Sequence, residues 1–383
     1  MSELDPRFAT LQTMQAAVRE HGDNGQAYRA LGNIAAKVKG DLIIFNYTPI
    51  AAYERQWTLI EQLCRGLILR ISTQAIVALP FFKFFNVNER EETLLERLPE
   101  LPDGVTRKVD GALGISYPAA DGLPAIATRG AFTSPEAEWA TVSLRTHYPR
   151  FCQQYDGAKT FLFEICAPLA VQPHITPEQE GLVLLGTRSL GANFGEDALY
   201  EEVTSTATLW GFPVVPTFRY STSEIVARCA TEEHEGYVAR YGDMRVKFKT
   251  NHYVTINRII TSMNPRRLRD YLQSGGEMEP LLRPLPPWYA TMLKSTADGM
   301  RNTIAAQEQY LLARYEALRF IESGKEFAEV AQGENPAIRA ALFALRNRNK
   351  SYLPILWKWL DLTAYELGFG VTGAAGLEPK LFP

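Results

Sequence analysis

The segment Lys108–Gly111 reads Lys-Val-Asp-Gly, which places a lysine two residues before an aspartate-glycine pair. The apolar run Leu113–Tyr117 follows it and is typical of a β-strand, so the segment would hold a primary amine beside a carboxylate at the mouth of a sheet. An amine held in this way can attack phosphorus and carry a nucleotide as a covalent phosphoramide. The aspartate-glycine pair could also be only a turn, so the rest of the chain has to supply the other groups that this chemistry needs.

Attack of a lysine on a nucleotide needs an uncharged amine, cations around the phosphates, carboxylates for a divalent metal and a purine pocket. The reference pKa of lysine is about 10.4, so we expect neighbouring cations or a metal to lower the pKa of Lys108. Four cations could meet the phosphates: Arg65, Lys83, Lys247 and Lys249. Lys83 stands among phenylalanines and would favour an anionic partner, although its side chain could also extend to the surface.

The runs Glu235–Arg240 and Met244–Thr250 predict a β-hairpin. Side chains alternate between the two faces of a strand, so Arg245, Lys247 and Lys249 would share one face, and the two apolar residues between them the other. The cationic face could be solvated over an apolar core. It could instead surround a polyanion such as a triphosphate, which would remove the repulsion among the cations.

Two acidic residues stand out by their surroundings. Glu164 interrupts the otherwise apolar run Thr160–Cys166, where an acid is costly unless it is paired, hydrogen-bonded or bound to a metal. Glu235 opens the first strand of the predicted hairpin. Carboxylate oxygens suit Mg²⁺, often through its waters. Glu164 could also be one member of a structural ion pair.

The bulk composition sets limits on the kind of protein. A chain of 383 residues, 46% of them hydrophobic, can bury more than one core, so we expect two domains. A net charge of −3 restricts any nucleic-acid surface to a local basic patch. The four cysteines show no paired spacing, which favours reduced thiols in a cytoplasmic protein over a zinc site or disulfides. We expect neither a secretory signal nor a membrane span.

The sequence changes character near residue 255. Before it, apolar runs separated by turn residues predict these strands: Leu42–Phe45, Gly66–Ile71, Ala75–Leu79, Leu113–Tyr117, Ala125–Thr128, Thr160–Cys166 and Gly181–Thr187. After it the pattern is helical, with helix starts at Asn264-Pro265 and Asn335-Pro336, a long helix through Leu311 and a Pro-rich linker over residues 280–287. We therefore expect an α+β protein: antiparallel sheets with flanking helices over residues 1–255, then an all-α domain over residues 256–383.

The order of these segments resembles the covalent nucleotidyltransferase superfamily of polynucleotide ligases and capping enzymes. The resemblance lies in Lys-Val-Asp-Gly at residues 108–111, Phe-Glu-Ile at 163–165, Glu-Gly-Tyr-Val at 235–238 and Lys-Phe-Lys at 247–249. The finer resemblance is to ATP-dependent RNA ligases of the phage RNA ligase 1 type. Those enzymes also carry the Cys-Arg-Gly of residues 64–66, the Lys-Phe-Phe-Asn of 83–86 and the Phe-Glu-x-x-Ala-Pro of 163–168. The similar region spans residues 40–265.

The resemblance implies a nucleotidyltransferase (ATP-grasp-like ligase) domain over residues 1–255. It implies an RNA ligase that joins 5′-phosphate and 3′-hydroxyl RNA ends through a lysine–AMP intermediate and an adenylylated RNA 5′ end, as in RNA repair. ATP would supply the AMP, with Mg²⁺ or Mn²⁺, and we expect a cytoplasmic monomer with no membrane contact. The helical domain could bind the RNA backbone through two basic clusters: Arg266, Arg267 and Arg269, and Arg346, Arg348 and Lys350.

The resemblance also assigns roles residue by residue. The catalytic residues would be Lys108 (the adenylylated lysine), Asp110, Glu235, Lys247 and Tyr253. The ATP-binding residues would be Tyr47, Arg65, Lys83, Lys108, Arg129, Glu164, Lys247 and Lys249. The metal would be held, mainly through water, by Asp110, Glu164 and Glu235.

Two positions depart from the family pattern. Arg129 stands where the family has lysine, and arginine keeps the charge but has a planar fork of donors. Ala112 stands where family members often carry serine, so one hydroxyl near the turn is absent. Both Tyr47 and Tyr253 could also be core aromatic residues, which is the commoner role of a lone tyrosine.

Three other functions remain open. Capping guanylyltransferases and DNA ligases share the pattern up to Lys-Phe-Lys, but they normally continue into a small β-barrel domain, which the helical pattern after Tyr253 disfavours. A non-catalytic relative that binds RNA or a nucleotide would retain binding without releasing pyrophosphate.

Overall fold

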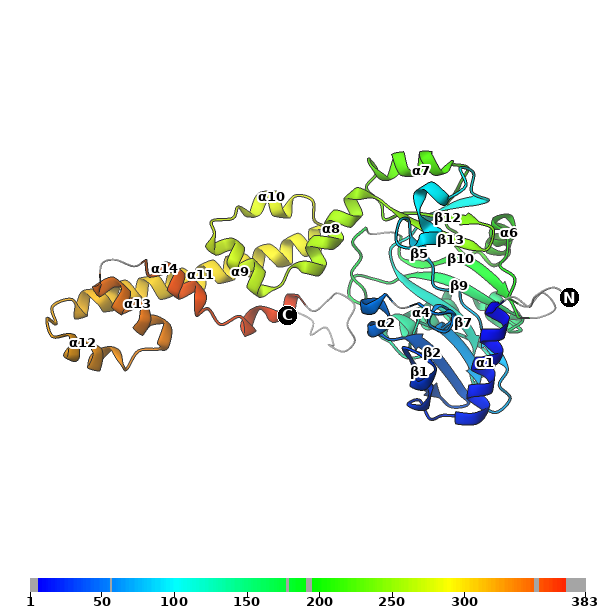
Figure 1. The fold of residues 1–383 in the computed structure, drawn as a ribbon, viewed down its shortest axis with the longest axis horizontal. Coiled ribbons are helices and arrows are strands. Elements are labelled where there is room, and N and C mark those ends of the chain that lie inside the picture. Colours follow the sequence, from blue (N-terminus) through cyan, green and yellow to red (C-terminus); the bar gives the residue numbers. More distant parts are fainter. Residues whose placement is uncertain (1–5, 56, 177–178, 191–194, 348–350, 370–383) are drawn as a thin grey trace. The chain divides into compact units, whose positions relative to one another are not determined.

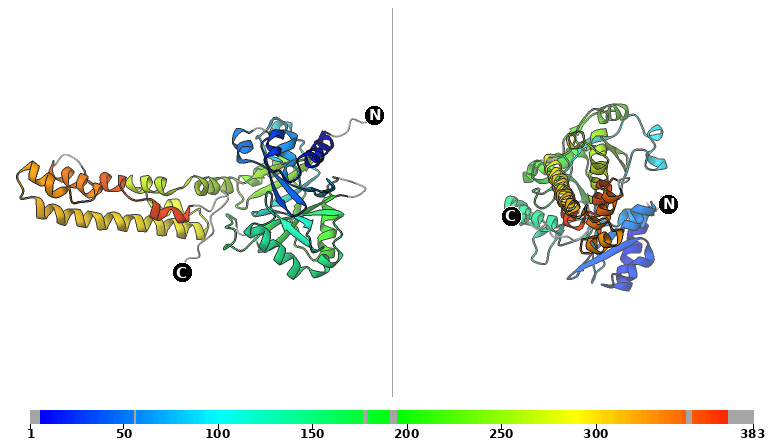
Figure 2. Two further views of the ribbon diagram at one scale, coloured as in Figure 1. Left: turned by 90° about the horizontal axis from the view of Figure 1, so that it is seen from below. Right: turned by 90° about the vertical axis from the view of Figure 1, so that its left-hand side faces the viewer.

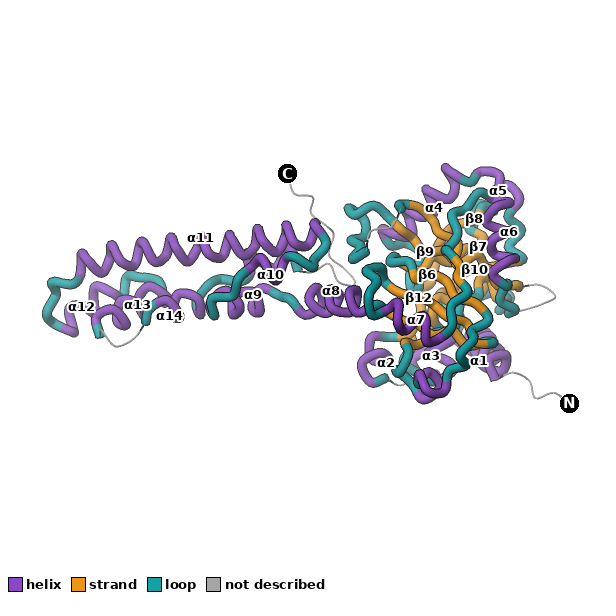
Figure 3. The backbone as a smooth tube through the Cα atoms, turned by 90° about the horizontal axis from the view of Figure 1, so that it is seen from above, coloured by secondary structure: helices purple, strands orange, loops and turns teal. Residues whose placement is uncertain are grey.

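This computed structural model describes residues 6–55, 57–176, 179–190, 195–347 and 351–369. The chain forms two compact units, Met1–Val254 and Thr255–Pro383, each described by itself below. All the strands of the described residues lie in the first unit (Figure 3).

The first unit contains three sheets (Figure 1). Sheet one has the order β1-β2-β3-β4: Ile34–Lys39, Leu42–Tyr47, Arg65–Arg70 and Ile76–Ala78. Sheet two has the order β10-β9-β7-β8: Gly181–Ser189, Lys159–Cys166, Ala112–Pro118 and Pro124–Ala127. Sheet three has the order β11-β6-β12-β13-β5: Thr217–Phe218, Gly104–Lys108, Gly236–Tyr241, Met244–Lys249 and Phe85–Asn86. Neighbouring strands are antiparallel throughout, apart from the parallel pair β13 and β5. The prediction of antiparallel sheets with flanking helices is therefore confirmed except at that edge.

Sheets one and two pack face to face because each presents alternate apolar side chains to the other. Ile44 and Ile68 of sheet one meet Ile115 and Leu162 of sheet two in one buried cluster. Helices cover the two outer faces. Their bounds, from α1 to α6, are Pro6–His21, Pro49–Glu54, Leu59–Leu63, Pro135–His147, Pro149–Gln154 and Tyr200–Trp210. Helices α1 and α3 pack on sheet one, and α4, α5 and α6 pack on sheet two.

Sheet three is apolar on one face only. Val105, Ala239, Val246 and Phe248 pack there against Ile225 of α7 (Thr222–Cys229). Because strand side chains alternate, Lys108, Lys247 and Lys249 point to the opposite face of the sheet. The predicted hairpin and its apolar core are thus confirmed, and the fold leaves the cationic face of sheet three available for a site.

The described part of the second unit is helical. Helix α8 (Asn251–Ser262) runs into it from the first unit, and α9 to α14 have the bounds Pro265–Gln273, Met278–Leu282, Pro287–Leu318, Gly324–Ala331, Pro336–Arg346 and Leu353–Lys358. The long α11 contacts α9, α10, α13 and α14 (Figure 2). Short 3₁₀ helices are Ala27–Leu31, Glu91–Thr93, Leu95–Arg97 and Thr363–Gly368.

Both predicted helix starts in this unit are confirmed, because Asn264 and Asn335 cap α9 and α13 through their side-chain oxygens. The predicted Pro-rich linker is confirmed only over residues 283–286, between α10 and α11, so its expected bounds of 280–287 are wrong. Pro280 lies inside α10 and Pro287 is the first residue of α11, where proline lacks only an N–H that a helix start leaves unpaired.

Three residues of the two predicted basic clusters, Arg267, Arg269 and Arg346, have partners within this unit. Arg269 pairs with Asp270, and Arg346 donates hydrogen bonds to the carbonyl oxygens of Ile321 and Glu322. Arg348 and Lys350 lie outside the described residues. Among the helices that are described, none has the length and apolar character that a membrane span requires.

Candidate active site

Strand register brings Lys108 and Lys249 to the two sides of Gly236. In sheet three, Gly236 of β12 pairs with Lys108 of β6 and with Lys249 of β13. Paired residues project to the same face, and Gly236 has no side chain to separate the two lysines. Glu235, which precedes β12 and is 3% exposed, reaches Lys108: its Oε2 lies 2.8 Å from the Lys108 Nζ, and its Oε1 lies 3.9 Å from the Lys249 Nζ.

The surroundings of Lys108 raise the pKa of its amine, whereas we expected them to lower it. Burial lowers the pKa of Lys108, but the negative charges of Glu235, Glu164 and Asp110 together outweigh burial, so the pKa is raised above its ordinary value. The expectation that cations lower this pKa is therefore wrong for the protein by itself. Lys108 is charged at neutral pH, and Glu235 Oε2 is the acceptor in place to take its proton.

Asp110 connects three parts of the site. Its Oδ2 accepts hydrogen bonds from the backbone N–H groups of Ile175 (2.7 Å) and Thr176 (3.0 Å), and its Oδ1 accepts one from the hydroxyl of Tyr253 (3.3 Å). Both carboxylate oxygens are therefore engaged with the loop after β9 and with the start of α8. This geometry favours a positioning role for Asp110 over direct contact with a metal.

Glu164 is an acid without a hydrogen bond or ion pair among the described residues. It lies on the central strand β9, between Leu113 of β7 and Val183 of β10. Burial raises the pKa of Glu164 to about 7, against the opposing charge of Lys108. An acid with these properties favours a cation as its missing partner.

The glycine of the Lys-Val-Asp-Gly segment brings the start of β7 close to Glu164. A Cβ at Gly111 would lie 2.6 Å from the carbonyl oxygen of Ile165 and 2.8 Å from the Glu164 Cγ. Both distances are shorter than real contacts allow. Only glycine therefore permits this approach, and the segment is more than a turn.

Glu164→Gln is expected to stabilise the fold at high pH only. The folded-state pKa of Glu164 lies above the ordinary 4.5, so the folded protein binds the proton more tightly than the unfolded chain does. Protonation of Glu164 therefore stabilises the folded state, and this stabilisation is lost as the pH rises through about 7. Glutamine imitates the protonated acid. We expect the free energy of unfolding to rise by about 1–3 kcal/mol near pH 8 and to change little near pH 5, measured by urea denaturation. The same gain at both pH values would contradict this, and exposed Glu138→Gln is the control.

Arg65 and Lys247 lie together without a counter-ion. The guanidinium carbon of Arg65 and the Nζ of Lys247 lie 5.8 Å and 4.6 Å from the centre of the same ring, that of Phe84. Burial lowers the pKa of both groups, and repulsion from neighbouring cations adds to the effect at Lys247. At Arg65, Tyr47 and Glu164 oppose the effect of burial. The Nη1 of Arg65 is buried without a hydrogen-bond partner, and the side chain of Lys247 makes no hydrogen bond or ion pair in the described part of the chain. Neither cation therefore has an ion-pair partner there, although the negative charge of Glu164 acts on Arg65 from a greater distance.

The cluster extends to Lys83 and Lys249. Burial lowers the pKa of Lys83 to about 8, and its Nζ lies 4.7 Å from the centre of the Trp57 ring. Burial also lowers the pKa of Lys249, whose Nζ lies 4.9 Å from the centre of the Tyr253 ring. Of the cations that were expected around a phosphate chain, these four lie on one face of the first unit.

Arg245 does not belong to this group. Its guanidinium pairs with Asp197, which also pairs with Arg188, and lies 4.1 Å from the centre of the Phe81 ring. The expectation that Arg245 surrounds a polyanion together with the two hairpin lysines is wrong, because Asp197 already compensates its charge.

Tyr47 and Arg129 contact each other. The Arg129 Nη1 donates a hydrogen bond of 2.6 Å to the Tyr47 hydroxyl, and the Tyr47 ring meets the edge of Trp57 with 4.8 Å between ring centres. Tyr47 is therefore not a core residue.

The carboxylates do not form a complete metal cage. Within the described residues, no group of three or more His, Cys, Asp and Glu side chains could hold an ion. A Mg²⁺ ion here would therefore take most of its ligands from water and from substrate oxygens, with Glu164 as the unpaired protein oxygen.

Thr250 is a part of the site that the sequence analysis overlooked. Its N–H donates to the Glu235 carbonyl oxygen (3.2 Å), and its hydroxyl donates to the His234 carbonyl oxygen (2.6 Å) and accepts from the Tyr253 N–H (3.1 Å). It thereby fixes Glu235 relative to Tyr253. The signal was present in the sequence, since a threonine just before a helix is a common N-cap.

A family model and a curated protein are similar to this chain in sequence. Residues 63–253 match the family model described as RNA ligase, of the T4 RNA ligase 1 type. A curated protein of Thermovibrio ammonificans, named "Putative RNA ligase", is 30% identical over 185 residues, which are 47% of this chain and 47% of that protein. The match therefore spans about half the length of this curated relative.

Solved structures are similar at lower identity. "Archaeal ATP-dependent RNA ligase - form 1" is 14% identical with a TM-score of 0.44, and the match covers 66% of this chain and 68% of that one. "Putative ATP-dependent DNA ligase from Aquifex aeolicus" is 17% identical with a TM-score of 0.43, covering 85% and 87%. On the family match and the curated relative, this chain belongs, through residues 63–253, to the RNA ligases of the phage RNA ligase 1 type in the covalent nucleotidyltransferase superfamily.

Proposed function

We propose that this chain is an ATP-dependent RNA ligase that becomes adenylylated on Lys108 and joins RNA 5′-phosphate and 3′-hydroxyl ends. The observation that carries the proposal is the arrangement around the amine. Lys108 is held at 2.8 Å by the buried Glu235, and neither Arg65 nor Lys247 forms an ion pair among the described residues. A triphosphate beside the amine would supply the missing negative charge.

In the first step, the Lys108 amine passes its proton to Glu235 Oε2. The free Nζ then attacks the α-phosphorus of ATP in line with the leaving group. A nitrogen–phosphorus bond forms as the phosphorus–oxygen bond to pyrophosphate breaks, the electron pair leaves on the pyrophosphate, and the nitrogen releases its second proton to solvent. Negative charge that develops on the phosphate oxygens is stabilised by Lys247 and Lys249 on one side and by Arg65 and Lys83 on the other.

A divalent metal fits this site at Glu164. Its carboxyl has no partner among the described residues, and its pKa is raised to about 7, so a cation is the compensation that it lacks. When bound, Mg²⁺ or Mn²⁺ neutralises charge on phosphate oxygens. Glu235 is engaged with Lys108 and Asp110 with backbone N–H groups, so both would act on a bound metal through water.

Two further transfers complete the reaction. An oxygen of the RNA 5′-phosphate attacks the phosphorus of the Lys108 adduct, the nitrogen–phosphorus bond breaks, and Lys108 recovers its proton. A 3′-hydroxyl then attacks the RNA 5′-phosphate and releases AMP. Tyr253 and Asp110, joined by their 3.3 Å contact, hold the segment beside Lys108 during these steps. The helical unit is proposed to contact the RNA backbone, and the enzyme to act as a cytoplasmic monomer.

A joining assay tests this function. Purified protein is incubated with a 5′-phosphorylated RNA, a nucleotide and Mg²⁺, and the products are separated on a denaturing gel. We expect ligated RNA and an adenylylated intermediate with ATP, and rates at least about a hundredfold lower with GTP or with DNA ends. Joining only of DNA, or an adduct formed only with GTP, would contradict the proposal in favour of a DNA ligase or a capping enzyme. Nucleotide binding without pyrophosphate release would indicate a non-catalytic relative.

A further inference from the structure

The geometry of in-line transfer restricts where the donor RNA can bind, and this inference rests on the proposed function. Pyrophosphate leaves the α-phosphorus on the side opposite to Lys108. In the next step the RNA 5′-phosphate must attack the same phosphorus, again opposite to Lys108. The 5′-phosphate therefore takes the place of pyrophosphate. The nucleoside attached to it must occupy the space beyond the last cation of the phosphate path.

The order of the strands gives the direction of that path. Lys108 ends β6, Lys249 and Lys247 lie two strands away on β13, and Lys247 pairs with Asn86 on the edge strand β5. Lys83 comes just before β5. The cations thus lead from Lys108 across sheet three to the β5 edge, and the space beyond them lies at this edge.

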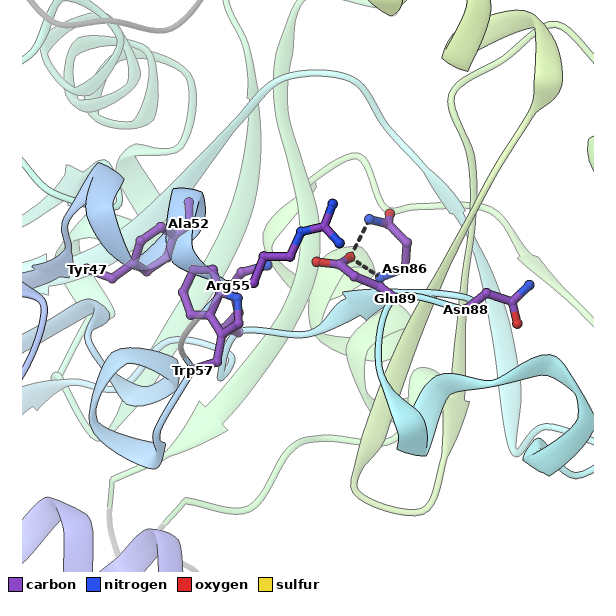
Figure 4. Close-up of a pocket in the computed structure, with 8 residues that line it drawn as sticks. Tyr47, Ala52, Arg55, Trp57, Asn86, Asn88 and Glu89 are labelled. Atoms are coloured by element: carbon purple, nitrogen blue, oxygen red, sulfur yellow. Dashed lines mark hydrogen bonds between the residues drawn. The ribbon is translucent and has the colours of Figure 1, made fainter.

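A cavity of about 470 Å³ lies there (Figure 4). Its walls are Tyr47, Ala52, Arg55, Trp57, Lys83, Asn86, Asn88 and Glu89. Lys83 belongs both to the phosphate path and to this wall, so the cavity continues the path. A volume of this order is within the range of small-ligand sites.

The wall beyond Lys83, called the outer wall, has no role in the steps described above; it consists of Ala52, Arg55, Asn86, Asn88 and Glu89. The side chain of Arg55 makes no hydrogen bond or ion pair among the described residues, and in Figure 4 it reaches toward Asn86 and Glu89. Glu89 Oε2 accepts hydrogen bonds from the backbone N–H (2.8 Å) and the side-chain amide (2.5 Å) of Asn86, whose own Oδ1 is buried without a partner. The wall therefore offers a cation without a counter-ion and an amide oxygen without a donor.

Backbone geometry singles out the same wall. Three residues other than glycine have a left-handed backbone in the described chain: Arg55 (φ 54°), Gln74 (φ 56°) and Asn88 (φ 61°). Two of the three line this cavity. The conformation is unfavourable for an arginine, and here it accompanies a side chain turned into the cavity.

We propose that this cavity binds the 5′-terminal nucleotide of the donor RNA. The 5′-phosphate lies at Lys83, the base and ribose pack beside the aromatic side chains of Trp57 and Tyr47, and Arg55 contacts the next phosphate of the chain. An aromatic wall accepts any base, and a guanidinium suits a phosphodiester. In this proposal ATP ends at Lys83, so the residues beyond Lys83 contact RNA and not the nucleotide substrate, and Tyr47 packs on the RNA in place of the ATP contact that the resemblance implied.

Two variants change the outer wall. Arg55→Gly removes the guanidinium and keeps the left-handed backbone, which glycine adopts freely. Ala52→Phe fills the cavity from the exposed side of α2. The matched control is Gln74→Gly, the same kind of change at a left-handed residue outside the cavity. Circular dichroism and the midpoint of thermal unfolding show that each variant is folded.

The assay separates the two chemical steps in the full-length protein. Formation of the Lys108 adduct is followed with ATP labelled at the α-phosphate. Transfer is then followed in a single turnover to a 5′-phosphorylated RNA whose 3′ end is blocked. We expect both variants to form the adduct within about twofold of the wild-type rate and to transfer AMP at least about tenfold more slowly at low RNA concentration. Gln74→Gly is expected to match the wild type in both steps.

A modified donor makes the test specific for the nucleoside. With the wild type, removing the 5′-terminal base of the donor RNA is expected to slow AMP transfer about tenfold. With Ala52→Phe, which is already slow, the same removal is expected to slow transfer hardly at all, because both changes remove the same contact. Unchanged transfer in both variants would overturn the inference. So would an equal loss of adduct formation and transfer, because the cavity would then bind ATP. Absence of an adduct in the wild type would instead remove the proposed function, and this inference with it.

Discussion

The variant Lys108→Met is expected to take up no label from ATP that carries its label on the α-phosphate. Methionine keeps most of the stem of the side chain but has no nitrogen to form the bond to phosphorus. The loss should be complete and not a change in rate, since no other group replaces an attacking atom. Exposed Lys37→Met is the control for the loss of a lysine and should label normally.

The same variant has a predicted effect on stability. Glu235 is 3% exposed, and without the Lys108 ammonium at 2.8 Å its buried charge is left with Lys249 at 3.9 Å. We expect the free energy of unfolding to fall by about 1–3 kcal/mol in urea denaturation. The double variant Lys108→Met with Glu235→Gln should recover much of this stability and still take up no label. Label in either variant would contradict the assignment of Lys108.

Gly236→Ala is expected to have the second-largest effect, because Gly236 lies between the two lysines. Its φ of 142° is rare for residues with a side chain. A Cβ there would lie 1.9 Å from the Phe248 carbonyl oxygen and 2.9 Å from the Lys249 Cα, so β12 and β13 would have to separate. We expect a loss of about 2–4 kcal/mol in the free energy of unfolding. The rate of adduct formation should fall about a hundredfold, the scale for a displacement of about 1 Å at a reacting group.

Gly242→Ala is the matched control in the same hairpin. Gly242 also has a positive φ (58°), but a Cβ there would meet nothing within 4 Å. It should therefore cost only about 1–2 kcal/mol of backbone strain and leave adduct formation nearly unchanged. If the two alanine variants behaved alike in urea denaturation and in labelling, the close approach at Gly236 would not be what holds the lysines together.

Strands that are nearly continuous apolar runs were predictable from the sequence. The strand β6, which ends at Lys108, was not. Thr160–Cys166 and Gly181–Thr187 agree with β9 and β10 to within two residues, because both segments are nearly continuous apolar runs bounded by turn residues. Gly104–Lys108 forms β6 although Arg107 and Lys108 interrupt its apolar pattern. Pairing with β12 and β11 stabilises this strand, and such long-range pairing leaves no local signal.

The sequence predicted the kinds of residue that belong to the candidate site, but it did not predict how those residues lie relative to one another. The order of the motifs indicated Lys108, Glu235 and Lys247, and these residues lie on one face of sheet three or beside it. Their register could not be read from the chain, since 127 residues separate Lys108 from Glu235. The sign of the Lys108 pKa shift depends on that register. So does the separation of Arg245 from the other cations, because Asp197 comes from a different part of the chain.

The position of AMP on the protein shows directly whether Lys108 is the residue that becomes adenylylated. Wild-type protein is incubated with ATP and a divalent metal and digested, and the modified peptide is sequenced by mass spectrometry under conditions that preserve a phosphoramide. We expect one AMP per chain, on the Nζ of Lys108, and its release when 5′-phosphorylated RNA is added. AMP on Lys247 or Lys249, or no covalent AMP while RNA is still joined, would contradict this assignment.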